Sequence, residues 1–265
     1  MTSAETLRGG DVTAGREDTA GVRQCPPPRA ELMLREQSRA CYPEESGYVE
    51  REGVRLFYEV YGTGEPTIVL LPTWSMLHMR HWKMQIAYLA RHFRVLTFDG
   101  RGSGKSDRPR DPDAYAEREF AADAVAVMDA TGTDKVSLVS LSLGAQRALL
   151  LAAEHPQRIR GAVFVAPTLP VAPGHDCRGV HPFDAVLDTD EGWAKHNAHY
   201  WLRDYPGFVD FFISQCLTDP HSTKPTEDAI GWALETDGEA LLAASTGPVL
   251  TQEDIRGLCA GIECP

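Results

Sequence analysis

The stretch Val136-Ser-Leu-Val-Ser-Leu-Ser-Leu-Gly144 runs from an apolar segment directly into the pattern Ser-x-Ser-x-Gly. A helical pattern follows, so Ser142 is predicted to lie on a tight turn between a strand and a helix. A serine hydroxyl is a weak nucleophile unless a turn exposes it and backbone amides can bind the oxyanion that it generates. Small residues at positions 140 and 144 permit such a turn, and the pattern therefore indicates a nucleophilic serine.

Short apolar segments alternate with helical patterns on both sides of this turn. The segments at 67–71, 93–98, 136–141 and 161–166 are predicted to be parallel strands. Residues 48–51 and 54–61 favour an antiparallel hairpin before them. Because right-handed crossovers place helices on both faces of such a sheet, we expect an α/β fold, a three-layer sandwich with a mostly parallel sheet.

The composition excludes several classes of partner. With 26 Lys and Arg against 38 Asp and Glu, the net charge of −12 would repel nucleic acid and an anionic membrane, and we expect neither as a partner. The chain shows no signal-peptide pattern and no apolar stretch near the roughly 18 residues that span a bilayer, which predicts a cytoplasmic protein. The six cysteines lack zinc-type spacing, so we expect no metal and no other cofactor.

The chain divides into four predicted regions. Residues 1–46 carry too few large apolar side chains to fold alone and are expected to form a disordered tail. We assign residues 47–167 to the α/β core, 168–258 to a helical cap and 259–265 to the start of a further core strand. The cap is rich in aromatic side chains, and Trp193, Trp201 and His221 are its candidate substrate contacts.

Three motifs, in order, resemble those of the α/β-hydrolase superfamily over roughly residues 47–167. They are the turn Ser140-Leu-Ser-Leu-Gly144, the turn Asp99-Gly-Arg-Gly-Ser-Gly-Lys-Ser106, and Arg80, Trp82 and Leu89 of the first helix. The loop Leu71-Pro-Thr-Trp74 and the cap segment His221-Ser-Thr-Lys224 are similar to an actinobacterial subgroup that occurs alone or joined to nucleotide cyclases. The Asp99 turn also looks like a phosphate-binding P-loop, but Asp99 replaces a required glycine and Pro109 blocks the following helix.

The resemblance implies a serine hydrolase of the esterase or lipase type that acts on a small or medium acyl ester. Ser142 would form the acyl-enzyme, and the backbone amides of Trp74 and Leu143 would be the oxyanion donors. One such donor is typically worth about 3 kcal/mol of transition-state stabilisation. Serine at position 142 excludes dehalogenase and epoxide hydrolase chemistry that uses an aspartate nucleophile. Hydrolysis of C–C bonds and cofactor-free perhydrolysis remain open.

The same resemblance implies an acid and a histidine that would follow the cap. Cys264-Pro265 is similar to the start of the seventh strand of the family, so neither loop is encoded in these 265 residues. Loss of a triad member costs on the order of 10⁴ to 10⁶ in turnover, and we expect a truncated form or gene fragment with weak or no activity. The alternative is a non-catalytic ligand-binding or regulatory module with the same fold. The substrate, oligomeric state and physiological role stay open.

Overall fold

The computed structural model describes residues 41–172, 174 and 179–265. The chain divides into residues 1–39 and 40–265, and only the second unit falls within the described part. The tail expected over residues 1–46 therefore lies mostly outside the described residues, while its last positions already belong to the first strand, β1 (Glu45–Arg51).

One sheet of six strands forms the centre of this unit, in the order β1-β2-β4-β3-β5-β6. The other strands are β2 (Val54–Tyr61), β3 (Thr67–Leu70), β4 (Arg94–Phe98), β5 (Val136–Leu141) and β6 (Ile159–Val165). Strands β1 and β2 form an antiparallel hairpin, and β2 is also antiparallel to β4. The remaining neighbours pair in parallel, as the continuous apolar runs predicted.

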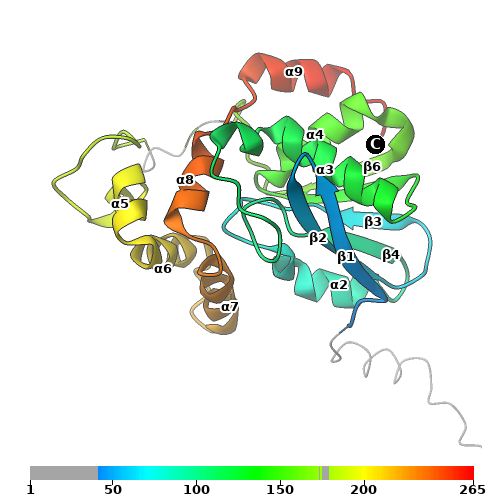
Figure 1. Cartoon of the computed structure of the whole chain (residues 1–265), viewed down its shortest axis with the longest axis horizontal. Helices are drawn as coiled ribbons and strands as arrows, with labels where there is room; N and C mark the ends of the chain where they lie inside the picture. Colours follow the sequence, from blue (N-terminus) through cyan, green and yellow to red (C-terminus); the bar gives the residue numbers. More distant parts are fainter. Residues whose placement is uncertain (1–40, 173, 175–178) are drawn as a thin grey trace, which may run out of the picture. The chain divides into compact units, whose positions relative to one another are not determined.

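Helices cover both faces of the sheet (Figure 1). On one face lie α3 (Glu117–Ala130), α4 (Gly144–Glu154) and α9 (Gln252–Ala260); on the other, η1 (Met79–Trp82) and α2 (Lys83–Leu89). Because successive side chains of a strand point to opposite faces, Val69 packs toward α3 and α4 while Leu70 packs toward Trp82 and Ile86. The expected three-layer sandwich is confirmed.

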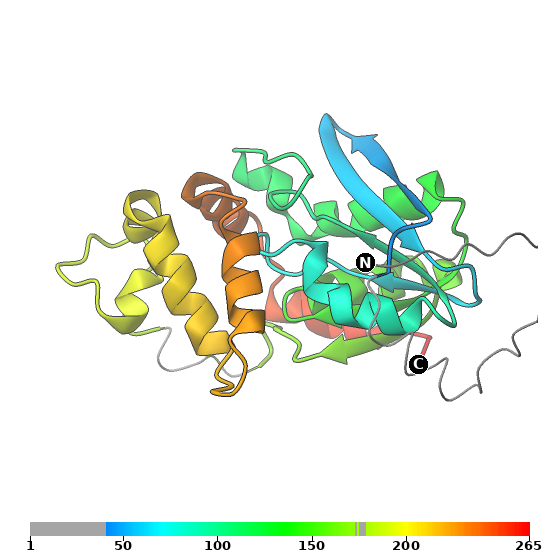
Figure 2. The same cartoon turned by 90° about the horizontal axis from the view of Figure 1, so that it is seen from below.

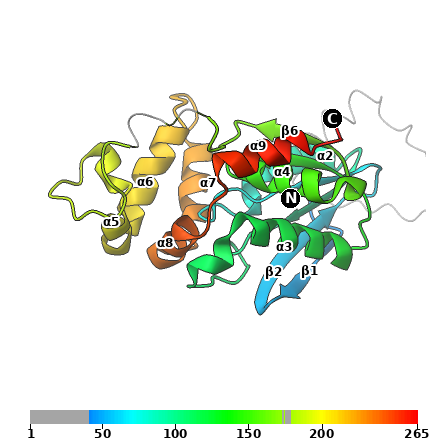
Figure 3. The ribbon, with the colours of Figure 1, turned by 90° about the horizontal axis from the view of Figure 1, so that it is seen from above.

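Helix α9 corrects the expected limit of the cap at residue 258. Figure 3 shows α9 beside α4, and Ile255 and Leu258 pack in the same core cluster as Leu150 and Leu151. The short connection that brings the chain back to the sheet includes Leu250, which is also part of this cluster. The cap therefore ends before Leu250, because the last helix buries its apolar face on the core.

The cap itself consists of η4 (Gly192–Lys195), α5 (Ala198–Arg203), α6 (Tyr205–Cys216), α7 (Lys224–Ala233) and α8 (Gly238–Thr246) (Figure 2). Asn197, Asp204 and Asp237 cap the amino ends of α5, α6 and α8 with their side chains. Pro225 stands in the first turn of α7, as expected. None of the helices in the described part of the chain is long and apolar enough to span a membrane.

Strand β6 is an exposed apolar edge of the sheet. Val163 is 57% exposed, and Phe164 and Val165 are exposed as well. Residues 259 and 260, expected in a further strand, end α9 instead, and residues 261–265 are irregular. Within that segment the carbonyl of Pro265 accepts a hydrogen bond of 3.0 Å from the amide of Ala162. The edge of β6 is thus paired at one point by the segment that ends at Pro265.

An apolar edge strand that is paired at a single point leaves most of its backbone groups able to recruit another strand, so we expect the 265-residue chain to self-associate through β6. A charge at this edge opposes such pairing. Val163→Lys is expected to lower concentration-dependent light scattering severalfold relative to the unmodified chain. Val186→Lys serves as the control, because Val186 is also an exposed valine, at 83%, but lies outside the sheet. Equal scattering of both variants would contradict association through β6.

Candidate active site

Ser142 occupies a strained turn at the carboxyl end of β5, directly before α4. Its φ angle of 53° lies in the left-handed region, which costs a residue with a side chain about 1–2 kcal/mol. Three backbone hydrogen bonds of 3.1 Å hold it there: Ser142 N–H donates to Val165 O, and Ser142 O accepts from the amides of Ala145 and Thr168. This geometry agrees with the strand-turn-helix context that the Ser-x-Ser-x-Gly pattern predicted.

Positions 140 and 144, two residues before and after Ser142, are both occupied by small residues. A Cβ atom at Gly144 would lie 2.8 Å from the carbonyl oxygen of Pro72, so only glycine lets α4 approach the loop after β3 this closely. Ser140 is buried and donates a hydrogen bond of 3.2 Å to Val163 O. The turn therefore accommodates a serine at position 140.

The two candidate oxyanion donors are backbone amides beside this turn. Leu143 is the N-cap residue of α4, where the positive end of the helix dipole favours a negative charge. Trp74 lies in the loop that follows β3, and no described residue accepts a hydrogen bond from the amide of Trp74 or Leu143. Neither amide is therefore engaged by another group in the described part of the chain.

The side chain of Trp74 reaches away from the sheet and into the cap. Its ring centroid lies 5.1 Å from that of Phe212, 5.8 Å from Trp201 and 6.2 Å from Phe208. Its Nε1 donates to Ser245 Oγ of α8 at 3.3 Å. The loop that carries one candidate oxyanion amide is thus packed directly against aromatic residues of the cap.

The structure separates the three cap residues that the sequence proposed as substrate contacts. Trp201 is only 1% exposed and belongs to the core of the cap, so its placement corresponds to a structural role. Trp193 is half-buried and packs edge-on against Phe211, with ring centroids 5.2 Å apart. His221 is exposed between α6 and α7, where its backbone amide donates to Asp219 Oδ1 at 2.9 Å.

Thr168 is a site residue that the sequence reasoning missed. Its Oγ1 lies 3.1 Å from Ser142 Oγ, within hydrogen-bond distance. Gln146 of α4 donates to Thr168 O at 3.3 Å and fixes this segment. The available signal was a small polar residue three positions after the end of β6, at the carboxyl edge of the sheet. Within the described residues, neither a histidine nor a carboxylate hydrogen-bonds Ser142 Oγ.

Two histidines that follow the loop after β3 in sequence are engaged elsewhere. His81 Nδ1 lies 2.8 Å from His78 O, and burial lowers the pKa of His81 to about 4, so this ring is neutral at pH 7. His78 lies between Asp99 and Glu235, with Nε2 3.5 Å from a Glu235 carboxylate oxygen. These contacts connect the core to the cap.

Asp99 fills the interior of the turn that looked like a phosphate-binding loop. Its carboxylate accepts hydrogen bonds from the amides of Met79 at 2.9 Å and Lys105 at 2.8 Å. Burial raises the pKa of this carboxyl despite those donors. Because a side chain of the protein already occupies the donors, the turn is structural, as interpreted from the sequence.

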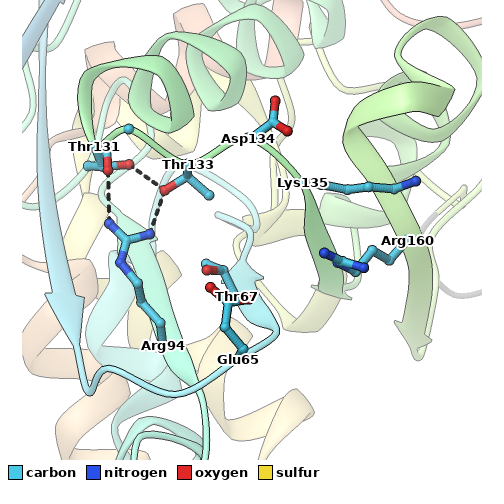
Figure 4. Close-up of a pocket in the computed structure, with 9 residues that line it drawn as sticks. Glu65, Thr67, Arg94, Thr131, Thr133, Asp134, Lys135 and Arg160 are labelled. Carbon is cyan, nitrogen blue, oxygen red and sulfur yellow. Dashed lines mark hydrogen bonds between the residues drawn. The ribbon is translucent and has the colours of Figure 1, made fainter.

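A polar cavity of about 410 Å³ lies where the parallel strands begin, at the end of the sheet opposite Ser142 (Figure 4). Thr67, Arg94, Lys135 and Arg160, from the amino ends of four strands or just before them, contribute to its lining. Arg94 is held there by Thr133 Oγ1 at 2.5 Å and Thr131 O at 3.0 Å. Ser142 lies at the carboxyl edge, so this cavity is separate from the nucleophile.

Over the described residues, no group of three or more His, Cys, Asp or Glu could hold a metal ion.

The sequence model described as the alpha/beta hydrolase fold matches residues 66–230, more than half of the chain. The protein therefore belongs to the α/β-hydrolase family. The chain is 29% identical over 189 residues to epoxide hydrolase B of Mycobacterium tuberculosis, which covers 67% of this chain and 49% of that protein. The chain is 30% identical over 200 residues to 2-hydroxymuconate semialdehyde hydrolase of Pseudomonas sp. strain CF600. The aligned region covers 65% of this chain and 67% of that protein.

Among solved structures, the esterase RhEst1 from Rhodococcus sp. ECU1013 is similar with a TM-score of 0.62 and 25% identity, over 83% of this chain and 78% of that one. The chain spans only 41% to 49% of the length of several curated relatives that it matches. The names of these relatives indicate different substrates, from an epoxide to 2-hydroxymuconate semialdehyde.

Proposed function

We propose that this chain carries the nucleophile and oxyanion donors of a serine hydrolase that cleaves a small or medium carboxylic ester. The observation that carries the proposal is Ser142 at φ 53°, between β5 and the amino end of α4. Holding a serine in this costly conformation exposes Oγ at the carboxyl edge of the sheet, where open α/β sheets bind ligands. The aromatic side chains around Trp74 favour an apolar acyl or alcohol group.

The proposed reaction proceeds in two steps. Ser142 Oγ attacks the ester carbonyl carbon, and the resulting oxyanion is bound by the amides of Trp74 and Leu143. The C–O bond to the alcohol then breaks, the alcohol leaves with the serine proton, and an acyl-enzyme remains for water to hydrolyse. An epoxide substrate is not proposed, because the nucleophile at position 142 is a hydroxyl and not a carboxylate.

A second candidate is a ligand-binding or regulatory module with the hydrolase fold. The contact between Ser142 Oγ and Thr168 Oγ1 favours it, since a threonine hydroxyl cannot accept the serine proton as a general base does. In this case the aromatic surface around Trp74 would bind a ligand without turnover, and binding would survive the loss of Ser142.

A fluorophosphonate probe tests the first candidate. In the labelling step Ser142 Oγ bonds to phosphorus, fluoride leaves and the proton passes to solvent. We expect slow stoichiometric labelling of Ser142, no labelling of Ser142→Ala, and unchanged labelling of Ser137→Ala, a serine within β5. Ester turnover by the 265-residue chain should be about 10⁴- to 10⁶-fold below that of a complete serine hydrolase, because no described residue acts as base.

Two outcomes would contradict this assignment. Labelling that persists in Ser142→Ala would place the reactive group elsewhere. If intact Ser142 is not labelled and an apolar ester still raises the melting temperature of both Ser142→Ala and the unmodified chain, the ligand-binding module is the correct description.

A further inference from the structure

We infer that Arg147 is a positioning residue for the oxyanion hole, which acts through the peptide bond between Thr73 and Trp74. The inference rests on the proposed function of Ser142 and extends it to a residue with no part in the sequence motifs. Arg147 lies on α4, five positions after Ser142, and is almost completely buried. Its Nη1 donates to Pro72 O at 2.8 Å and to Thr73 O at 2.6 Å.

The geometry of the peptide bond between Thr73 and Trp74 links this contact to the Trp74 amide, the candidate oxyanion donor. In a trans peptide the C=O and the N–H point in opposite directions, so fixing Thr73 O also fixes the direction of the Trp74 N–H. The guanidinium binds the carbonyl, so the amide of Trp74 faces away from the guanidinium. A charge-assisted bond at the carbonyl also polarises the peptide and strengthens its N–H as a donor.

Arg147 is itself held in place from two directions. Its Nε donates to Glu117 Oε2 at 2.9 Å, which neutralises the buried charge. The guanidinium carbon lies 3.6 Å from the ring centroid of Phe120, a cation–π contact. Glu117 and Phe120 both belong to α3. Movement of the guanidinium away from the loop after β3 would therefore break both contacts.

Because of the hydrogen bond between Arg147 and Thr73 O, one helix, α4, positions both Ser142 and the two candidate oxyanion donors. Ser142 and Leu143 directly precede α4, and Arg147 projects from its second turn to bind the loop that carries Trp74. The segment of this loop that Arg147 contacts is Pro72-Thr73. Arg147 binds the carbonyl oxygens of these two residues, which holds the loop whatever side chains it carries.

The rate of Ser142 phosphonylation tests this role. Arg147→Met keeps an apolar chain over Phe120 but removes the donors, and we expect the first-order labelling rate to fall about 10- to 100-fold with little change in probe affinity. Arg147→Lys retains one charged donor and should recover part of the loss. The matched control is Arg158→Met, which also removes an arginine that binds two backbone carbonyls and a carboxylate, at the other edge of the sheet.

A spectroscopic readout distinguishes failure of this inference from failure of the proposed function. Selective labelling with ¹⁵N-tryptophan gives five backbone amide signals, of which Trp74→Phe identifies one. We expect Arg147→Met to move the Trp74 amide signal upfield, and Arg158→Met to leave it in place. If Ser142 never reacts but the signal moves, the nucleophile assignment fails while Arg147 still polarises the peptide. An unmoved Trp74 signal, or an unchanged labelling rate in folded Arg147→Met, would overturn the inference.

Discussion

We expect replacement of Asp123 by alanine to lower the free energy of unfolding by about 3–5 kcal/mol, because the buried Arg101 guanidinium loses the carboxylate that lies closest to it. Asp123 is fully buried on α3 and accepts two hydrogen bonds of 2.7 Å from Arg101, at Nε and Nη2. Arg51 Nε donates to the same carboxylate at 2.7 Å. Since Arg101 is also buried, its guanidinium cannot turn to water when Asp123 is removed.

Asp129 provides the control on the same helix. It pairs with Arg158 at 2.8 Å but is 60% exposed, and a surface pair of this kind contributes only about 0–1 kcal/mol. The midpoints of urea unfolding should therefore differ clearly between Asp123→Ala and Asp129→Ala. Equal midpoints would show that Asp123 does not anchor the turn that contains Arg101.

Replacement of Gly144 by alanine is expected to lower the rate of Ser142 labelling about 100-fold, comparable with the loss of one oxyanion donor. The added Cβ would lie 2.8 Å from Pro72 O, so the loop after β3 must move away from α4. That movement carries the amide of Trp74 with it. The measurement is the labelling rate of folded protein at saturating fluorophosphonate.

Gly231 is the matched control for this substitution. It lies within α7, and a Cβ there would meet nothing within 4 Å. Gly231→Ala should raise stability by about 0.5–1 kcal/mol, since alanine favours a helix over glycine, and leave labelling unchanged. A labelling rate for Gly144→Ala equal to that of Gly231→Ala would mean that close approach of α4 to Pro72 is not required.

The parallel strands of the sheet were predictable from sequence because each is a short apolar run, whereas β1 and β2 were predicted from a hairpin pattern. Strand β5 begins and ends where the pattern placed it, and Ser142 follows it in the conformation that the motif requires. The extent of the cap was not predictable to the same degree. The apolar face formed by Ile255 and Leu258 is typical of any amphipathic helix, and only the tertiary structure determines whether it packs on the cap or on the core.

Site residues outside the motifs were not predictable for a related reason. Trp201 and Trp193 have the same residue type and lie in the same region, yet one is buried in the cap and the other half-buried. Thr168 and Arg147 contact residues that are far from them in the sequence, Ser142 and Thr73 respectively. The contact between Arg147 and Thr73 spans 74 positions, and no local pattern encodes it.

Trp74 limits how this protein can be engineered. Its backbone contributes to the proposed oxyanion hole, while its ring is part of the packing among Phe208, Phe212 and Trp201. A cap taken from another hydrolase would have to reproduce a cavity for this indole and an acceptor for its Nε1, now Ser245 Oγ. Exchange of caps to alter specificity therefore requires that residue 74 and its aromatic neighbours be transferred as one unit.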